Sequence, residues 1–307
     1  MGPPRRLRQL RWSTWRGIIW RSAKGFVDDN CGDWAAALTY YGVLAVFPSA
    51  IVVIALVRLF VDGEEAYQAL MDIARQVLPA SVVDAIDAPL HAVVNAEEPS
   101  RVLISFGMLG ALWSASSYIG AFTRASNAIY GVREGRPFYW LRPLQFALAA
   151  VALVLMALVV VVLVVSGPVA EAVGDALGLG DSVIRTWEIG KWPLLVLLVT
   201  ILLTLLYWVA PNVQQPRFRW LTVGGALALV VWVVGSVGFG VYVSNFGSYD
   251  KTYGSLGAVI AFLVWLYVSN SAIMLGVELN AEVQRGRQLQ GGAEDVEAPL
   301  PPREAAQ

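Results

Sequence analysis

The sequence predicts an all-α membrane protein, a bundle of six transmembrane helices, and three observations carry this prediction. Six stretches of the chain, each about as long as a bilayer is thick, contain no Asp, Glu, Lys, Arg or His. A helix needs about 20 such residues to cross a hydrocarbon core of about 30 Å. The composition, 57% hydrophobic and 15% charged, is that of a membrane protein. Lys and Arg are also more numerous in the tails and in every second connection between the stretches than in the remaining connections. The predicted spans are 34–57, 102–123, 146–165, 192–210, 220–243 and 254–277.

The orientation of the bundle is predicted by its Lys and Arg residues. Of the 22 in the chain, 16 fall in the N-terminal tail, the second and fourth connections and the C-terminal tail. Basic connections stay on the cytoplasmic side of a membrane. Both termini are therefore expected in the cytoplasm, and an odd number of spans would destroy the alternation.

Three regions follow one another along the chain. Residues 1–30 are basic and interleave Arg with Trp, which predicts a helix in the inner headgroup region. Residues 31–285 hold the six-helix transmembrane domain. Its first outer loop, 62–100, has apolar residues at helical spacing, which predicts short amphipathic helices that lie on the membrane or cap the bundle. Residues 286–307 are acidic and Pro-rich, and we expect a disordered cytoplasmic tail there.

The composition also excludes several classes of function. One Cys and one His exclude a disulfide framework and a His/Cys metal cluster, so no metal and no cofactor is expected. A net charge of −1 offers no global attraction for nucleic acid. The first apolar run begins after residue 30 and is too long for a signal-peptide core, so it should be retained as an anchor.

The first span carries three candidate site residues on one helical face, Asp33, Tyr40 and Pro48. A carboxylate at Asp33 suits the positive end of the helix dipole. Pro48 removes a backbone hydrogen bond and should kink the helix. A kink beside a tyrosine can open a polar cavity, although a cap and a packing kink explain the same residues.

The second and sixth spans carry the remaining candidates. Ser117, Arg124 and Asn127 share a face of the second span, and Tyr267, Asn270 and Glu278 lie together on the sixth. These residues predict a polar cavity or gate between the helices. The bland alternatives are helix packing and an arginine that extends to the lipid headgroups.

Asp33, Arg124 and Glu278 are expected at the same cytoplasmic level. An acid–base–acid cluster between the first, second and sixth spans would neutralise charges that are costly to leave alone beside lipid. Such a cluster predicts either an ion-pair gate or static pairing of helix ends.

Small residues four apart, Ser236 and Gly240, favour a close helix crossing on the fifth span.

Several ordered segments resemble the YihY/BrkB family of bacterial inner-membrane proteins. They are Asp33–Pro48, Leu112–Ser116 leading to Asn127–Tyr130, Arg136–Phe138, Tyr253–Gly257 with Trp265–Tyr267, and Leu275–Asn280. The resemblance covers about residues 15–285 and implies a six-span protein of the bacterial inner membrane. Members have been called transporters or virulence factors, and an older family label was ribonuclease BN. One His and the lack of a metal-ligand cluster argue against a nuclease. Ser117 stands where the family usually has Gly.

The polar residues leave three functions open. The first is a transporter or gate for a lipid or amphipathic solute, with Asp33 and Glu278 as proton-coupling candidates. The second is a non-transporting scaffold or envelope-maintenance protein, in which polar residues serve packing. The third is an intramembrane enzyme, which we do not expect, because the serines of the second span have no His or Lys partner at helical reach. Membrane lipids are the expected partners, nucleic acid is not, and the oligomeric state is left open.

Overall fold

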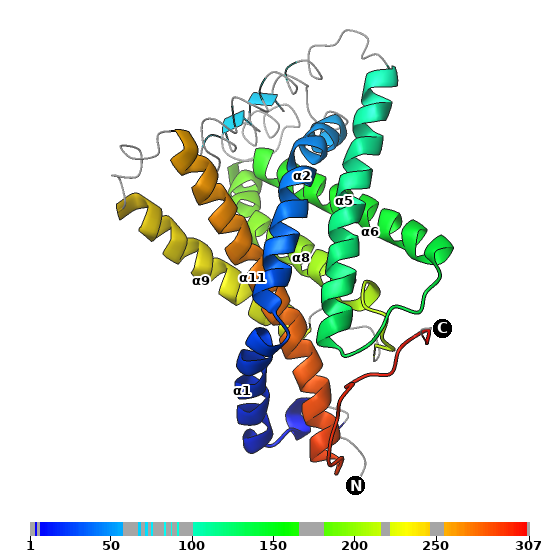
Figure 1. The fold of residues 1–307 in the computed structure, drawn as a ribbon. Helices are drawn as coiled ribbons and strands as arrows, with labels where there is room; N and C mark the ends of the chain where they lie inside the picture. The colour runs from blue at the N-terminus through cyan, green and yellow to red at the C-terminus, as the bar shows by residue number, and fades with distance from the viewer. Residues whose placement is uncertain are drawn as a thin grey trace.

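The computed structural model describes residues 7–57, 101–165, 181–215, 222–245 and 255–305, together with residue 4 and isolated positions between 67 and 91. Within these residues the long elements are all helices, as the sequence predicts (Figure 1). A short 3-10 helix, η1, spans Leu7–Gln9. The α-helices are α1 (Trp12–Asp28), α2 (Cys31–Val57), α5 (Arg101–Ile129), α6 (Phe138–Val164), α8 (Asp181–Val209), α9 (Val223–Asn245) and α11 (Ser255–Gln290).

Each predicted span overlaps one long helix, in the order α2, α5, α6, α8, α9 and α11. By length and hydropathy, four helical stretches in the described part qualify as spans: Phe138–Leu163, Arg185–Val209, Val223–Val243 and Val259–Gln290. The six-span topology and its orientation stay predictions. Helices continue beyond the uncharged stretches because an apolar run marks only the part of a helix that suits lipid. At 36 residues, α11 is about 54 Å long and exceeds a hydrocarbon core.

The helices pack as neighbouring pairs around a shared core. The most extensive contacts join α2 to α5 and α9 to α11, with α6 and α8 behind α2 and α5 in Figure 1. Phe122 of α5 stacks on Tyr207 of α8, with ring centroids 6.0 Å apart. Met274 and Val277 of α11 are buried in the same cluster.

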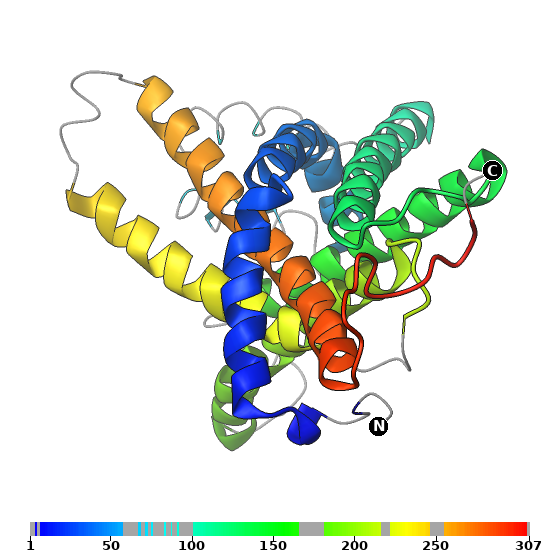
Figure 2. The same cartoon turned by 60° about the horizontal axis from the view of Figure 1, so that its bottom comes forward.

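The N-terminal helix α1 lies along the last third of α11 (Figure 2). Ile18 is fully buried there, in an apolar cluster with Leu279 and Val283. Asn30 connects α1 to α2 in a left-handed conformation, with φ of 52°, which Asn tolerates better than most residues. Trp12 and Trp20 are exposed. The predicted place of residues 1–30 among lipid headgroups stays a prediction.

The C-terminal segment differs from the disorder expected for residues 286–307. Helix α11 continues to Gln290, and the chain that follows runs back under the bundle (Figure 2). Side chains of α11 hold its backbone: Gln288 donates to the carbonyl of Pro299 at 2.6 Å, and Arg285 donates to that of Val296 at 3.0 Å. The segment is polar, as the prediction of disorder assumed. It is nevertheless held in place, because these α11 side chains donate to backbone carbonyls that would otherwise need water.

The outer loop 62–100 lies mostly outside the described residues. At the described positions the backbone is helical, and Tyr67 and Met71 are buried. The hydroxyl of Tyr67 donates to Asp87, and its ring contacts His91 edge-on at 5.3 Å. The two predicted amphipathic helices are therefore not tested as whole elements.

Candidate functional site

Glu278 is a buried carboxyl group on α11, at the end of the bundle where α1 lies. Its residue is 1% exposed, and its carboxyl group lies near enough to that of Asp29, in the joint between α1 and α2, for the two to form a hydrogen bond when one of them carries a proton. Helix α1 comes this close because residue 25 is Gly, and a Cβ atom there would collide with Oε1 of Glu278. Oε2 of Glu278 has no hydrogen-bond partner among the described residues. Two carboxyl groups in such contact favour sharing one proton, because like charges this close resist joint ionisation.

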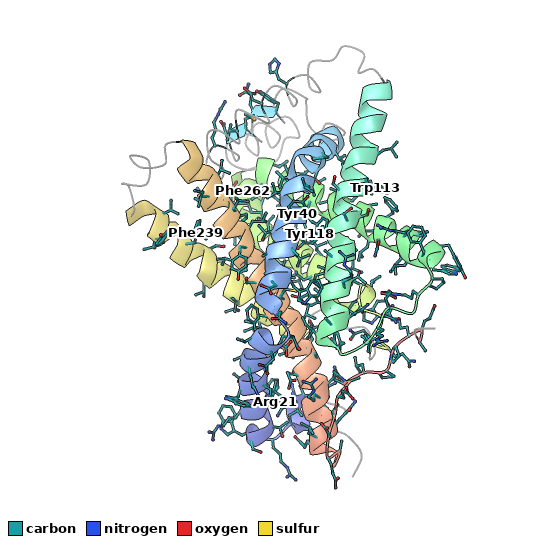
Figure 3. The ribbon with its side chains drawn as sticks, viewed as in Figure 1. Arg21, Tyr40, Trp113, Tyr118, Phe239 and Phe262 are labelled. Atoms are coloured by element: carbon teal, nitrogen blue, oxygen red, sulfur yellow. The ribbon has the colours of Figure 1, made fainter. Side chains whose placement is uncertain are left out.

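One turn further along α11, Glu282 has its charge compensated. Arg21 of α1 lies between α1 and α11 in Figure 3 and donates from Nε to Oε2 of Glu282 at 2.6 Å. Arg285, on the same helix as Glu282, pairs with the other carboxylate oxygen. A buried carboxylate is tolerated when it is paired in this way. We call these residues the carboxyl cluster; its members are Asp29, Glu278, Glu282, Arg21 and Arg285. Its three carboxyl groups and two guanidinium groups balance in charge when Asp29 and Glu278 share one proton.

The pKa of Asp29 lies above its ordinary value of 3.8. Burial is the largest cause, and the negative charges of Asp28 and Glu282 act in the same direction. The hydrogen bond with Glu278 and the charge of Arg285 lower this pKa without cancelling the rise. Among the described residues, no group of three or more His, Cys, Asp or Glu side chains could hold a metal ion. The arrangement is therefore suited to holding a proton.

Asn270, a predicted site residue, joins three helices in the middle of the bundle. Its Nδ2 donates to Oγ1 of Thr39 on α2 at 3.1 Å, and its Oδ1 accepts from the hydroxyl of Tyr118 on α5 at 2.8 Å. Figure 3 shows Tyr118 between α2 and α5. Asn270 itself lies on α11 and is buried. The contact ties the helices together, and its polar groups satisfy one another.

The predicted trio Asp33, Arg124 and Glu278 does not come together. Asp33 lies in the first turn of α2, as the helix-dipole argument requires, and is exposed. Arg124 is exposed on α5, and no described ion pair joins it to either acid. The partners of Glu278 come instead from the joint that follows α1.

Four further candidate residues lie apart from the carboxyl cluster. Tyr40 is 62% exposed on α2, and Tyr267 is exposed on α11. Ser117 donates its hydroxyl to a backbone carbonyl one turn earlier on α5, at 3.0 Å. Pro48 lies inside α2, whose ribbon changes direction in its upper part in Figure 1. Their role in a cavity or gate stays a prediction.

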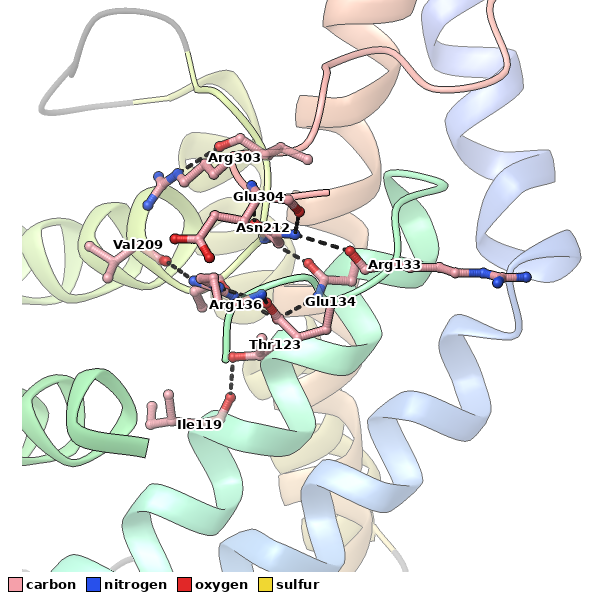
Figure 4. Close-up of polar contacts among 12 residues, drawn as sticks. Ile119, Thr123, Arg133, Glu134, Arg136, Val209, Asn212, Arg303 and Glu304 are labelled. Carbon is pink, nitrogen blue, oxygen red and sulfur yellow. Dashed lines mark hydrogen bonds and ion pairs between the residues drawn. The ribbon is translucent and has the colours of Figure 1, made fainter. Parts of the chain in front are cut away.

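Asn127, the ninth candidate, lies in the last turn of α5. It belongs to a polar network that includes Glu134, Arg136 and Asn212, which Figure 4 shows. Its amide donates to Glu134 at 2.9 Å and accepts from the backbone N–H of Asn212 at 2.7 Å. Arg136 binds the same Glu134 at 2.7 Å and donates to the carbonyl of Ala210 at 2.7 Å. Burial opposes ionisation of Glu134, but the hydrogen bonds from Arg136 and Asn127 outweigh it and hold its pKa below 4.5.

The network also binds the C-terminal segment. Asn212 is fully buried, and its Nδ2 donates to the carbonyls of Arg133 at 3.0 Å and Glu304 at 2.8 Å. The N–H of Arg303 donates to the carbonyl of Asn212 at 3.1 Å. The guanidinium of Arg303 lies 5.3 Å from the ring centre of Trp208. One side chain, Asn212, thus connects the segments after α5, α8 and α11.

Sequence reasoning missed Asp29, Arg21 and Asn212 as site residues. Glu282 and Arg285 carry a visible signal, because they follow Glu278 by four and seven residues and so share its helical face. Asp29 carries no such signal, since its approach to α11 depends on the turn at Asn30.

Comparisons with known proteins place the chain in a family. A family model described as virulence factor BrkB matches residues 22–300. The chain is 31% identical over 256 residues to the ribonuclease-like protein YfkH of Bacillus subtilis, and the alignment covers 83% of this chain and 90% of YfkH. It is 30% identical over 278 residues to a UPF0761 membrane protein of Rhodospirillum centenum, covering 88% of this chain and 58% of the relative.

A UPF0761 membrane protein of Alkalilimnicola ehrlichii is 27% identical over 268 residues, covering 83% of this chain and 56% of the relative. The chain therefore spans less than two thirds of the length of these UPF0761 relatives. No solved structure matches the chain. Since the family model and the alignment with YfkH both extend over most of the sequence, this protein belongs to the virulence factor BrkB family of membrane proteins.

Proposed function

We propose that this protein is a transporter or gate for a lipid or another amphipathic solute. It would lie in the bacterial inner membrane with six spans and both termini in the cytoplasm. The observation that carries the proposal is the contact between the buried Glu278 and the half-buried Asp29, because it joins α1 and α2 to α11 through a group that can gain or lose a proton.

Loss of the shared proton would change how these helices fit together. With both groups ionised, the charges of Asp29 and Glu278 would repel each other across the α1–α11 contact. The space beside Gly25 is filled by the Glu278 carboxyl group, so repulsion at this carboxyl group would act directly on α1. The ion pair between Arg21 and Glu282, one turn away, would keep α1 attached to α11. A ligand or proton that favours one of two helix arrangements shifts the balance between them. The carboxyl contact would then act as the gate, rather than the predicted trio.

The proposal includes no catalytic step. On α5, the hydroxyls of Ser116 and Ser117 both donate to the backbone carbonyl of Trp113, at 2.8 and 3.0 Å, and an activated nucleophile needs a base there instead. The ribonuclease-like name of YfkH belongs to that protein, and we propose that the present chain is not a nuclease. Membrane lipids are its proposed partners.

A scaffold or envelope-maintenance protein is the alternative, and the contacts of Asn270 favour it. This side chain joins α2, α5 and α11 through one donated and one accepted hydrogen bond, which packing alone would explain. A scaffold would keep these contacts without moving any solute.

The proposal is tested with purified protein in vesicles of phosphatidylethanolamine and phosphatidylglycerol that contain a fluorescent trace of either lipid. We expect wild-type protein to speed the movement of labelled lipid between leaflets and to respond to an imposed pH gradient. Glu278→Gln removes the titrating group but keeps a side chain of the same size, so it should abolish the response to the gradient. Ser271→Ala is the control, since Ser271 on α11 donates only to its own helix.

Wild-type protein that moves neither lipid faster than protein-free vesicles, with or without a gradient, would refute the proposal and leave the scaffold. Equal responses of wild type and Glu278→Gln would remove the carboxyl contact from the mechanism. Size-exclusion chromatography of each variant shows that the compared proteins are folded.

A further inference from the structure

Helices α5 and α6 cross at Gly120, where two unused polar groups meet. A Cβ atom on Gly120 would lie 3.4 Å from Nε2 of Gln145, on α6, and 3.6 Å from Nη1 of Arg124, on α5. The Gln145 amide and the Arg124 guanidinium therefore border the same space beside this glycine. Gln145 is only 5% exposed, and its buried Oε1 has no hydrogen-bond partner among the described residues.

A second guanidinium lies on the same side of the crossing. Arg142 precedes Gln145 by one turn of α6 and stacks over the ring of Phe138 at 5.4 Å. Arg124 follows Gly120 by one turn of α5, so both arginines lie between the crossing and the connection of the two helices. None of the ion pairs of the described residues includes Arg124 or Arg142. Cationic groups beside apolar helices are costly unless an anion accompanies them.

An apolar surface continues from the other side of the crossing. Trp113 is 63% exposed on α5 and contacts Phe146 of α6, with ring centroids 6.0 Å apart. Figure 3 shows Trp113 on the length of α5 away from its connection to α6. Polar groups at one end and exposed aromatic rings at the other match the two parts of an amphiphile. A guanidinium binds a phosphate through paired charge-assisted hydrogen bonds.

We propose that Arg124, Gln145 and Arg142 bind the phosphate group of an anionic amphiphile whose hydrocarbon chain lies along Trp113 and Phe146. The Gln145 amide donates from Nε2 to a phosphate oxygen, and its unpartnered Oε1 accepts from a hydroxyl group of the same amphiphile. The two guanidinium groups balance the charge of the phosphate. The inference rests on the proposed function for its physiological meaning, because it names the chemical class of the transported or gating solute. The binding itself needs no transport.

The test is native mass spectrometry of the full-length protein in detergent, titrated with phosphatidylglycerol or with phosphatidylcholine. We expect wild type to retain phosphatidylglycerol in preference to phosphatidylcholine. Arg124→Ala should weaken phosphatidylglycerol binding about tenfold, the usual effect of losing one charge-assisted contact. Arg124→Lys should restore part of it. Gln145→Leu, which keeps the volume of the side chain, should weaken it as well.

Arg133→Ala is the matched control, because Arg133 is an exposed arginine in the same connection and lies outside the proposed site. Equal phosphatidylglycerol binding by wild type, Arg124→Ala and Gln145→Leu would overturn the inference. Competition by millimolar inorganic phosphate would identify a free phosphoester as the source of the bound group, and lack of competition would identify a lipid. Binding that persists in a protein that moves no lipid would count against the proposed function alone.

Discussion

At the scale of single residues, the missing side chain at Gly25 sets how closely α1 approaches α11. Oε1 of Glu278 occupies the space that a Cβ atom would need. Gly25→Ala should therefore push the helices apart and destabilise the protein by about 1–3 kcal/mol, the usual cost of an added methyl group in a packed contact. This loss would outweigh the gain of about 0.5–1 kcal/mol that Ala brings to a helix interior. The thermal unfolding midpoint in detergent measures it.

Gly17 on the same helix gives the matched control. A Cβ atom there would meet only the end of the flexible Arg21 side chain, so Gly17→Ala should leave the midpoint unchanged or raise it. If both variants unfold at the same temperature, α1 does not press against Glu278.

Single residues also show where sequence reasoning stops. It identified Glu278 and Asp33 as acids near one level of the bundle, yet only Glu278 enters the cluster. Asp29 takes the place expected for Asp33, because Asn30 has a positive φ and turns the chain between α1 and α2. A helical wheel drawn through α2 cannot include that turn. Side-chain spacing predicts contacts within one helix but not across a joint.

At the scale of elements, small residues predicted that helices cross closely but not where. Ser236 and Gly240 suggested a crossing on α9. Ser236 does contact α11, since it accepts from the indole N–H of Trp265 at 3.2 Å, whereas a Cβ atom on Gly240 would have nothing within 4 Å. The two backbones come closest at the other end of α9, where a Cβ atom on Gly224 would collide with the backbone carbonyl of Gly276. Small pairs recur throughout apolar helices, and only the partner helix decides which of them is used.

The segments that follow α5, α8 and α11 are joined by Asn212, and this contact can be tested. Asn212→Ala should destabilise the protein by about 1–3 kcal/mol, because buried carbonyl and amide groups lose their partners. It should also release the C-terminal segment, since the bonds to Glu304 are lost. Limited proteolysis detects that release as faster cleavage after α11.

Gln214→Ala is the control for this effect. Gln214 lies two residues away, and its side chain donates an exposed hydrogen bond to the carbonyl of Pro302. This bond should contribute less to stability than the buried bonds of Asn212, because water can replace it. Equal protease resistance of wild type and Asn212→Ala would show that the C-terminal segment is held by other contacts.

At the scale of the whole molecule, the contacts at one end of the bundle bear on the number of crossings. Arg21 before α2 pairs with Glu282 near the end of α11. Asn212, after α8, binds Arg133, after α5, and Glu304, after α11. Segments that meet at one end of a bundle are separated by an even number of crossings, which is the alternation that the basic residues predict. The side of the membrane on which this end lies is predicted by the distribution of Lys and Arg alone.

That side can be measured with single cysteines in a Cys31→Ser background, since Cys31 is the one cysteine of the chain. Ser13→Cys and Ala293→Cys place a thiol on exposed positions near the two termini, and Val183→Cys places one at the opposite end of α8. In intact cells, a membrane-impermeant maleimide should label only Val183→Cys if the basic end of the bundle faces the cytoplasm, as its Lys and Arg residues predict. The other two should react once the membrane is permeabilised. Labelling of one terminus alone in intact cells would require an odd number of spans, and labelling of both would invert the bundle, so that the carboxyl cluster would face the outside.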